Sequence, residues 1–298
     1  MPGPGRRTNG GSFVRIAVAS GKGGTGKTTI ATGLALSAAA AGKSVAYVDC
    51  DVEEPNGHIY LKPRIDRTTA VATRVPVIDE TSCTLCRRCV EACRFGALAV
   101  ARDRVLSFPE LCHACGACGL VCPVGAISEG RREVGIVRSG TAGAVRHIDG
   151  LLTVGEAMPM PVLREVVKLA PDASLQVLDA PPGTSCPVVE TLVSAEAVLL
   201  VVEPTLFGLH DFSLATELVS DLGRPAFVVV NKDDGSGRGH AAAAKAGLAV
   251  LASFPEKRHI AELCSGGEHP VLTVPDYAAT MDELRAALTG VGESGGRS

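Results

Sequence analysis

The stretch Gly21-Lys-Gly-Gly-Thr-Gly-Lys-Thr-Thr29 decides the fold. It lies between an apolar run at Val14–Ala19 and an Ala-rich stretch at Lys27–Ala41, which we expect to form a buried strand and a helix. A glycine-rich loop in this setting matches the P-loop pattern. Its backbone N–H groups can turn toward phosphates, and the helix N-terminus adds partial positive charge. The sequence therefore predicts a nucleotide site in which Lys27 reaches the β- and γ-phosphates and Thr28 ligates Mg²⁺.

The alternation of short apolar runs and helical stretches continues along the chain. Further strands are expected at Val45–Asp49, Leu175–Asp179, Val198–Val202, Ala226–Asn231 and Leu248–Ala252. Helices are expected near Met160–Ala170, Asp211–Asp221, Lys257–Cys264 and Tyr277–Leu288. Continuous apolar strands that alternate with helices are typical of a parallel sheet covered on both faces. The sequence therefore predicts an α/β protein with a doubly wound, mostly parallel sheet.

Three aspartates lie at or just after the carboxyl ends of predicted strands: Asp49, Asp51 and Asp179. Ligands of open α/β sheets bind in the crevice at this edge. Phosphoryl transfer depends mostly on positioning and charge compensation, which carboxylates beside a P-loop can provide. Asp49 and Asp179 are therefore candidates for a place beside the phosphates and the Mg²⁺ ion that Thr28 is expected to ligate.

The form Lys22-Gly-Gly-Thr-Gly-Lys-Thr28 resembles the deviant Walker A motif of the MinD/ParA group of P-loop ATPases. Val48-Asp-Cys-Asp51 is similar to the second acidic motif of that family, and Leu178-Asp-Ala-Pro-Pro-Gly183 to its Walker B and switch II segment. The resemblance implies an ATP-binding and ATP-hydrolysing protein, slow and stimulated by a partner.

Site residues also follow from the resemblance. It implies that Lys22 contacts phosphate across a nucleotide-sandwich dimer, that Asp51 orients or activates the attacking water, and that Asn231 reads the adenine base. The expected nucleotide-binding residues are Gly21, Lys22, Gly23, Gly24, Thr25, Gly26, Lys27, Thr28, Thr29 and Asn231. The dimer is expected to join two copies of this chain, or this chain and a related ATPase.

Eight of the 11 cysteines lie between Cys83 and Cys122, in two similar runs. The runs have the spacing Cys-x2-Cys-x2-Cys-x3-Cys of bacterial ferredoxins, in which the fourth cysteine ligates the other cluster. We expect two [4Fe–4S] clusters, the first on Cys83, Cys86, Cys89 and Cys122, and the second on Cys93, Cys112, Cys115 and Cys118. Zinc prefers separated cysteine pairs around one ion, and disulfides are rare inside cells. Arg94 replaces the usual proline after the first run, whereas Pro123 follows the second.

The two runs interrupt the α/β pattern, which resumes after them, so they form an insertion. We expect a discontinuous ATPase domain over 14–76 and 138–290, with a small α+β dicluster ferredoxin domain inserted at 77–137. Residues 1–13 are expected to be a disordered tail and 291–298 a flexible one.

Composition excludes several functions. With 3% aromatic residues, no Trp and a net charge of −3, the chain has neither a stacking surface nor a basic footprint for nucleic acid. No apolar stretch reaches the roughly 18 residues that span a bilayer, and Met281–Leu288 lacks the basic face of a membrane-binding helix, so no stable membrane anchor is expected. Arg6-Arg7 is not followed by the apolar stretch of an export signal, which predicts a cytoplasmic protein.

Three cysteines and one aspartate lie outside these motifs. Cys50, Cys186 and Cys264 are expected to be small buried or incidental thiols. Cys186 lies seven residues after Asp179, the offset at which the related nitrogenase iron protein ligates a subunit-bridging cluster, but no clear second bridging cysteine is present. Asp211 is expected to cap a helix.

The resemblance implies a function in which a nucleotide-dependent dimer switch is coupled to iron–sulfur or metallocofactor assembly or delivery. One alternative is an ATP-gated electron-transfer protein with two permanent clusters, and another is a positioning or partitioning ATPase whose clusters are structural. The expected partner is a small metallocofactor-carrier protein or a redox protein. The residues by themselves do not choose between the first two functions.

Overall fold

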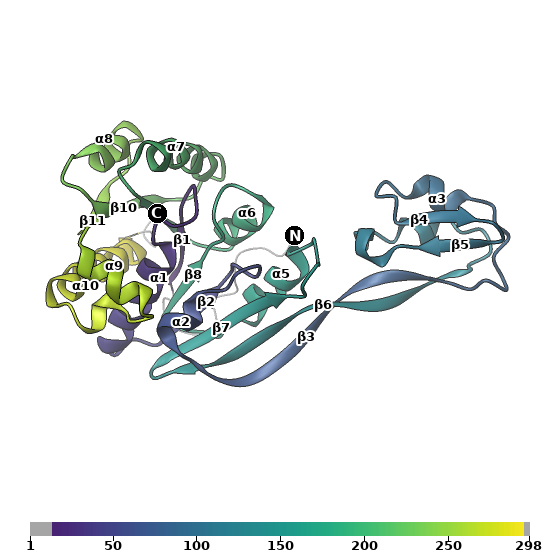
Figure 1. The fold of residues 1–298 in the computed structure, drawn as a ribbon, viewed down its shortest axis with the longest axis horizontal. Coiled ribbons are helices and arrows are strands. Elements are labelled where there is room, and N and C mark those ends of the chain that lie inside the picture. Colours follow the sequence, from purple (N-terminus) through teal and green to yellow (C-terminus); the bar gives the residue numbers. More distant parts are fainter. Residues whose placement is uncertain (1–13, 295–298) are drawn as a thin grey trace.

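A computed structural model describes residues 14–294, and its central element is a nine-stranded sheet with the order β11-β10-β9-β1-β8-β2-β7-β6-β3 (Figure 1). The strands are β1 Val14–Ala19, β2 Val45–Asp49, β3 Arg64–Ile78, β6 Ile127–Ala142, β7 Val145–Leu152, β8 Leu175–Asp179, β9 Ala197–Val202, β10 Ala226–Asp233 and β11 Val250–Pro255. From β11 to β7 neighbouring strands are parallel, whereas β6 is antiparallel to both β7 and β3. The predicted mostly parallel α/β sheet is therefore confirmed.

Helices bury both faces of this sheet. On one face, Ile30 and Leu34 of α1 and Met281 and Leu284 of α10 join the apolar core. On the other, the core takes in side chains from α5, α6, α7 and α8. The helices are α1 Lys27–Ala40, α2 Gly57–Leu61, α5 Met160–Leu169, α6 Cys186–Val193, α7 Leu206–Asp221, α8 Arg238–Lys245, α9 Arg258–Ser265 and α10 Pro275–Ser294. In the part of the chain that the structure covers, no helix has both the length and the apolarity to cross a membrane.

The prediction that Asp211 caps a helix is wrong, because α7 begins five residues earlier, at Leu206. Thr205 is the residue that caps it. Its backbone is extended and its hydroxyl accepts a hydrogen bond from the N–H of Gly208 at 3.1 Å, which is the usual arrangement of an N-cap threonine. Asp211 therefore lies inside the second turn of the helix.

At the other end of the chain, α10 continues to Ser294. The predicted tail at 291–298 would therefore begin inside this helix, and residues 295–298 lie outside the described part, as does the predicted tail at 1–13.

Strands β3 and β6 form a two-stranded arm that the sequence did not predict (Figure 1). Strand β6 pairs with β7 only from Gly135 to Ala142, and its first half pairs with β3 alone. Where β6 leaves the sheet, Val71 pairs with Gly135 and Ala72 with Glu133, so Val134 forms a bulge. A Cβ on Gly135 would lie 2.5 Å from the carbonyl oxygen of Leu151, so only glycine fits at this crossing.

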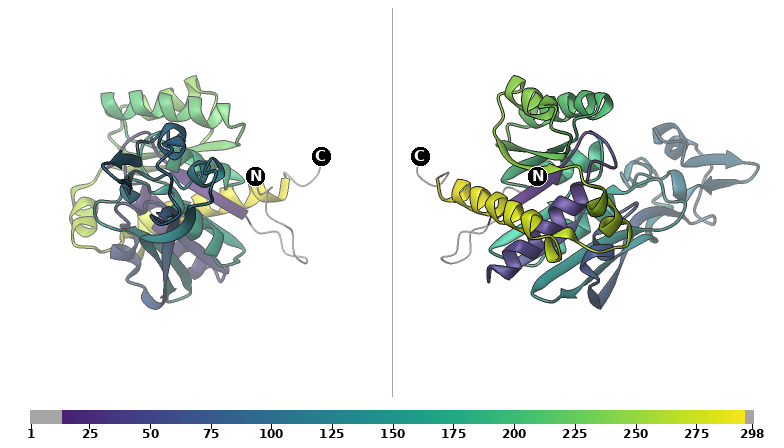
Figure 2. Two further views of the ribbon diagram at one scale, coloured as in Figure 1. Left: turned by 90° about the vertical axis from the view of Figure 1, so that its right-hand side faces the viewer. Right: turned by 60° about the vertical axis from the view of Figure 1, so that its left-hand side comes forward.

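The arm carries the cysteine module, by which we mean residues 79–126 between the two strands. The module contains the helices α3 Arg88–Ala92 and α4 Ala117–Leu120, the 3₁₀ turn η1 Pro109–Leu111, and the hairpin of β4 Leu98–Ala101 and β5 Arg104–Ser107. Figures 1 and 2 show that it stands apart from the helices of the main sheet, at the far end of the arm. The limits predicted for the insertion, 77 and 137, fall inside β3 and β6.

Candidate functional site

The P-loop connects β1 to the first turn of α1, as the sequence predicts. Gly24 and Gly26 have φ angles of 78° and 90°, a backbone conformation that favours glycine. A Cβ on Gly26 would also lie 2.2 Å from Nδ2 of Asn231. This Asn231 amide donates a hydrogen bond to the carbonyl oxygen of Thr25 at 2.7 Å. The loop thus packs on β10, and the role of Asn231 toward adenine stays a prediction.

Glu203 holds Lys22, the lysine that marks the deviant motif. Nζ of Lys22 donates to Oε1 of Glu203, whose side chain is 7% exposed at the end of β9. Lys232 donates to the other carboxylate oxygen at 3.1 Å and to the carbonyl oxygen of Gly24 at 2.7 Å. Burial by itself would raise the pKa of Glu203, but hydrogen bonds from Lys22, Lys232 and Thr205 outweigh it and lower the pKa. Sequence analysis missed Glu203, although a carboxylate that ends an apolar strand was an available signal.

Asp49 and Asp179 lie side by side at the carboxyl ends of β2 and β8. The hydroxyl of Tyr47 donates to Oδ2 of Asp179 at 2.8 Å and lies 3.3 Å from Oδ2 of Asp49. The backbone N–H groups of Gly57 and Asp51 donate to Asp49 at 3.0 and 3.2 Å. The structure therefore brings together the two carboxylates that the sequence assigned to Mg²⁺.

The charges at this point are only partly compensated. Burial raises the pKa of both carboxyl groups, and for Asp49 the charge of Asp179 adds to the effect. For Asp179, the charge of Lys27 and hydrogen bonds from Thr28 and Tyr47 oppose the rise without cancelling it. A cation bound beside the two carboxylates would stabilise their charged forms.

Two buried oxygen atoms mark where a ligand fits. Oδ1 of Asp179 and the hydroxyl of Thr25 are buried without a hydrogen-bond partner, which is costly unless a ligand contacts them. Mg²⁺ in proteins usually takes one or two carboxylates and receives its other oxygens from phosphates and water. Asp49, Asp179 and Thr28 fit a magnesium–nucleotide complex in this way.

Asp51 lies in the loop after β2 and is partly exposed. Its Oδ1 accepts a hydrogen bond from the N–H of Glu54 at 3.3 Å. Burial raises its pKa, against that hydrogen bond and the charge of Lys27. The remaining predicted loop residue with a side chain, Thr29, has its hydroxyl 3.4 Å from that of Tyr60.

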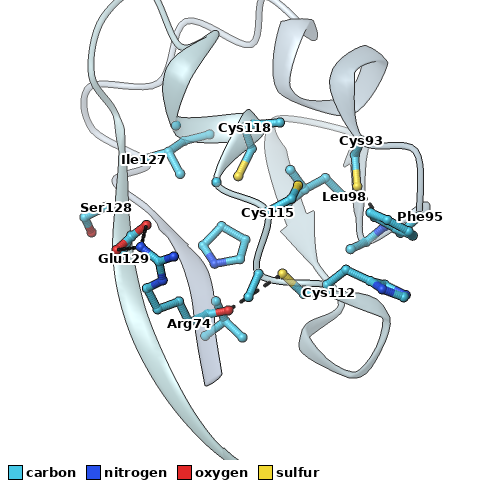
Figure 3. Close-up of a pocket in the computed structure, with 18 residues that line it drawn as sticks. Arg74, Cys93, Phe95, Leu98, Cys112, Cys115, Cys118, Ile127, Ser128 and Glu129 are labelled. Atoms are coloured by element: carbon cyan, nitrogen blue, oxygen red, sulfur yellow. Dashed lines mark hydrogen bonds and ion pairs between the residues drawn. The ribbon is translucent and has the colours of Figure 1, made fainter. Parts of the chain in front are cut away.

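The eight clustered cysteines line two separate cavities in the cysteine module. Cys93, Cys112, Cys115 and Cys118 line the first (Figure 3). Cys83, Cys86, Cys89 and Cys122 line the second. Each cavity thus combines three cysteines of one run with the fourth of the other, which is the crossed grouping predicted from their spacing.

The two runs repeat one backbone conformation. The residues before and after the second cysteine of each run have positive φ: 56° at Leu85 and 69° at Arg87 in the first, 53° at Ala114 and 75° at Gly116 in the second. A second repeated feature is a backbone N–H four residues after the last cysteine, which donates to its sulfur at 3.3 Å. The internal duplication seen in the sequence is therefore present in three dimensions.

The first cavity has two further features. The exposed rings of Phe95 and His113, one from each run, stack with centroids 3.7 Å apart. Arg74 of β3 and Glu129 of β6 form an ion pair at 3.1 Å where the arm meets the cavity (Figure 3). Both strands of the arm therefore help to line it.

The three other cysteines lie apart from these cavities. Cys50 is buried, as expected, and Cys264 is partly exposed. Cys186 is exposed at the first residue of α6, so it is not a buried thiol, the first of the two alternatives expected for it. Between residues 14 and 294, no three His, Cys, Asp or Glu side chains meet closely enough to hold a single metal ion.

Sequence analysis missed a second polar cluster beside Asp49. It consists of His147 and Asp149 on β7 and Arg138 on β6. The sequence did not indicate these residues because neither β6 nor β7 was predicted.

Comparison with known proteins places the chain in a family. Residues 16–271 match the CobQ/CobB/MinD/ParA nucleotide-binding domain. Two uncharacterized proteins of Methanocaldococcus jannaschii, MJ0579 and MJ0578, are each 32% identical to it, over 221 and 224 residues. The matches cover 73% and 74% of this chain and 79% of each relative.

Solved structures share the fold. The septum site-determining protein MinD of Pyrococcus horikoshii, complexed with Mg-ADP, is 20% identical with a TM-score of 0.58, over 94% of this chain and 98% of that one. A Cyanothece McdA variant in complex with ATP is 17% identical with a TM-score of 0.56, again over 94% and 98%. The chain therefore belongs to the CobQ/CobB/MinD/ParA family of nucleotide-binding proteins, and its main sheet has the fold of MinD.

Proposed function

We propose that this protein is an ATPase that carries two permanent [4Fe–4S] clusters and uses its nucleotide state to control electron transfer from them to a partner protein. The observation that carries the proposal is the division of eight cysteines between two cavities, four to each. When bound, such clusters supply one-electron redox chemistry, with Cys thiolates as their ligands.

The cysteine module fits clusters better than single ions. Each cysteine of a cubane binds a different iron, so four ligand sulfurs lie further apart than those around one ion. This agrees with the four cysteines around each cavity. The left-handed conformations of Leu85, Arg87 and Ala114 are unfavourable for these side chains. Ligation by the intervening Cys86 and Cys115 explains why the chain adopts them.

The position of the cysteines favours permanent clusters over clusters that leave as cargo. Cys89 and Cys112 are buried among the few apolar side chains of the module, and Cys93 and Cys118 pack against them. Because each cavity takes cysteines from both runs, release of one cluster would free ligands in both halves. The module would then lose the groups that hold its halves together.

The nucleotide site has the residues that phosphoryl transfer requires. We assign Lys27 to the β- and γ-phosphates, Thr28, Asp49 and Asp179 to Mg²⁺, and Asp51 to the attacking water. Burial raises the pKa of Asp51, which makes its carboxylate a stronger proton acceptor.

The ion pair between Lys22 and Glu203 bears on the dimer. In the single chain Glu203 neutralises Lys22, so Lys22 has to exchange this partner before it can reach a nucleotide on another subunit. We propose that ATP-dependent dimerisation drives this exchange. Lys22→Ala is then expected to slow ATP hydrolysis more than it weakens ATP binding, and normal hydrolysis by this variant would contradict the sandwich dimer.

Cluster delivery is the second candidate function, and one observation favours it. Cys86 and Cys115, one in each cavity, are exposed, so an acceptor thiol could approach each cluster from outside. Delivery to a metallocofactor-carrier protein would use these two positions.

The two functions can be separated in one experiment. Anaerobically purified protein, reduced with dithionite, is mixed either with oxidised cytochrome c or with apo-ferredoxin, each with and without Mg-ATP. Electron transfer predicts that ATP changes the rate of cytochrome reduction while all iron stays with the protein. Lys27→Ala should keep its iron and its visible cluster absorbance but lose the effect of ATP.

Two results would contradict the proposal. Iron that moves to apo-ferredoxin in the presence of Mg-ATP would establish delivery instead. Anaerobically purified protein that binds no iron would exclude both functions and leave only the nucleotide-dependent activity of the family.

A further inference from the structure

One row of charged side chains crosses four strands, from the nucleotide site to the arm. In the sheet register, Asp179 of β8 lies beside Asp49 of β2, Asp49 beside Asp149 of β7, and Asp149 beside Arg138 of β6. Neighbouring positions in register carry side chains on the same face of a sheet. The row therefore extends on the α1 face from the predicted Mg²⁺ ligands to the strand that leads to the cysteine module.

Direct contacts connect the members of this row. Tyr47 donates to Asp179, and its ring stacks on that of His147, with centroids 5.7 Å apart and the planes inclined by 17°. Nε2 of His147 lies 3.1 Å from Oδ2 of Asp149. Arg138 then binds both oxygens of Asp149, through Nε at 2.9 Å and Nη2 at 2.7 Å.

Most of these side chains are buried, which strengthens the electrostatic interactions between them. The side chains of His147 and Asp149 are fully buried, and that of Arg138 is 26% exposed. Burial alone would raise the pKa of Asp149, but hydrogen bonds from His147 and Arg138 outweigh it and lower the pKa. Asp149 is therefore ionised, and Arg138 compensates its charge. The charges of the neighbouring Asp49 and Asp179 would instead be compensated by a bound cation. The pKa of Arg138 is raised, mainly by its hydrogen bonds to Asp149 and also by the charge of Asp49.

Arg138 is close to the place where β6 leaves the sheet. It pairs with Asp149 of β7 on one side and Thr68 of β3 on the other, and the bulge at Val134 lies four residues away. Beyond the bulge, β6 pairs with no strand but β3, although Arg132 of β6 still forms an ion pair with Glu156, which follows β7. A change in the bidentate contact of Arg138 would thus act on the part of β6 that still pairs with the main sheet.

We propose that Tyr47, His147, Asp149 and Arg138 form a coupling chain, through which Mg-nucleotide at Asp49 and Asp179 alters the mobility of the β3–β6 arm. A cation at the two carboxylates changes the charge next to the Tyr47 hydroxyl and the Arg138 guanidinium. The contacts of His147 and Asp149 transmit that change to β6. The coupling is reciprocal, so the state of the arm also alters nucleotide affinity. It rests on the proposed function only in that the arm carries the redox module.

The test is hydrogen exchange of the full-length protein, followed by mass spectrometry over residues 127–142, with and without a non-hydrolysable Mg-ATP analogue. For the wild type we expect the analogue to change exchange on the arm by about fivefold or more, the lower end of typical coupling. The double variant Arg138→Gln/Asp149→Asn removes the charge pair together, which avoids leaving an unpaired buried charge. It should respond less than about twofold at saturating analogue.

Two further variants sharpen the test. Arg64→Gln/Asp66→Asn breaks an exposed ion pair on β3, outside the row and outside both cavities, and should respond like the wild type. Arg138→Lys keeps the charge but gives up the bidentate contact, so it should respond weakly even if the double variant does not fold.

Each remaining outcome has a clear meaning. A wild-type arm that does not respond to the analogue, or an Arg138→Lys protein with the full wild-type response, would overturn the coupling chain. Because exchange does not require iron, it separates the two proposals. Anaerobically purified protein that binds no iron but still shows the response would refute the proposed redox function and leave the coupling intact.

Discussion

The nucleotide-binding part and the cysteine module gain their stability in different ways. In the first, helices bury both faces of the sheet, and large side chains such as Tyr47, Phe254 and Leu199 are fully buried. In the module the buried clusters are small: Ala97 and Cys112, which pack with Val75 of β3, and Cys89, Leu98 and Val105. A unit this small rarely buries enough apolar surface to fold without disulfides or metals. The main sheet is therefore stabilised by apolar packing, whereas the small apolar clusters of the module contribute much less, and the proposed metal clusters would supply the rest.

Buried polar groups also have different partners in the two parts of the molecule. In the main sheet, buried charges have specific partners, such as Arg138 for Asp149 and Lys22 for Glu203. In the module, the corresponding groups are free thiols, and burial raises the pKa of Cys89 and Cys118. Such thiols stay protonated until a metal displaces the proton. The buried charges of the main sheet are therefore paired within the chain, whereas the thiols of the module would be paired by the metal that we propose for it.

Iron removal should give the largest effect. Anaerobic chelation is expected to unfold the module, because metal binding and folding are linked when a small domain lacks a core. Backbone exchange over residues 79–126 should rise to the rate of an unfolded chain, while exchange in β1, β8 and β9 stays constant. Unchanged exchange in the module after complete iron loss would show that its apolar contacts suffice.

Acid should affect the main sheet through His269, which accepts from the N–H of Val271 and whose Nε2 contacts the carbonyl oxygen of Thr29 at 2.8 Å. Burial lowers the pKa of His269 from 6.5 to about 4. The unfolded chain therefore binds the proton more readily, so this contribution to stability is complete above pH 6.5 and is lost as the pH falls toward 4. The loss amounts to about 3 kcal/mol, at 1.36 kcal/mol for each pH unit.

The measurement for His269 is denaturant unfolding of the wild type and His269→Gln between pH 7 and 4. Glutamine does not titrate, so the difference in unfolding free energy between the two proteins should shrink by about 3 kcal/mol over this range. Comparison with the variant removes the contributions of Asp49 and Asp179, whose raised pKa values act in the opposite direction. Parallel pH profiles for the two proteins would refute the assignment.

The smallest expected effect concerns the two halves of the module. Arg87 has a φ of 69°, where the equivalent Gly116 has 75°. Arg87→Gly should relieve an unfavourable conformation and stabilise the iron-loaded module by up to about 1 kcal/mol. Arg88→Gly is the matched control, because it places glycine in the first turn of α3, where it should destabilise by a similar amount. Thermal unfolding of both variants measures the effect, and equal shifts would show that the left-handed position carries no strain.

Much of the fold could be predicted because the inner strands are continuous apolar runs. Strands β1, β2 and β8 have the predicted bounds, and the P-loop lies between the elements expected for it. Strands β3 and β6 could not be found in this way. The arm is largely exposed, and β6 contains Gly130, Gly135 and Gly140, so neither strand shows the apolar pattern of a buried one.

The sequence by itself determined the features that depend on local pattern and spacing: the phosphate loop, the apolar strands beside it, and the pairing of each cysteine run with one residue of the other. These are encoded by residues close together in the chain. Only the tertiary structure decided that Glu203 holds Lys22, that Asp49 and Asp179 share Tyr47, and that Arg138 and Asp149 continue their row toward the cysteine module. Those contacts join residues far apart in sequence, and they arise from the strand order and register of the sheet, which no local pattern specifies.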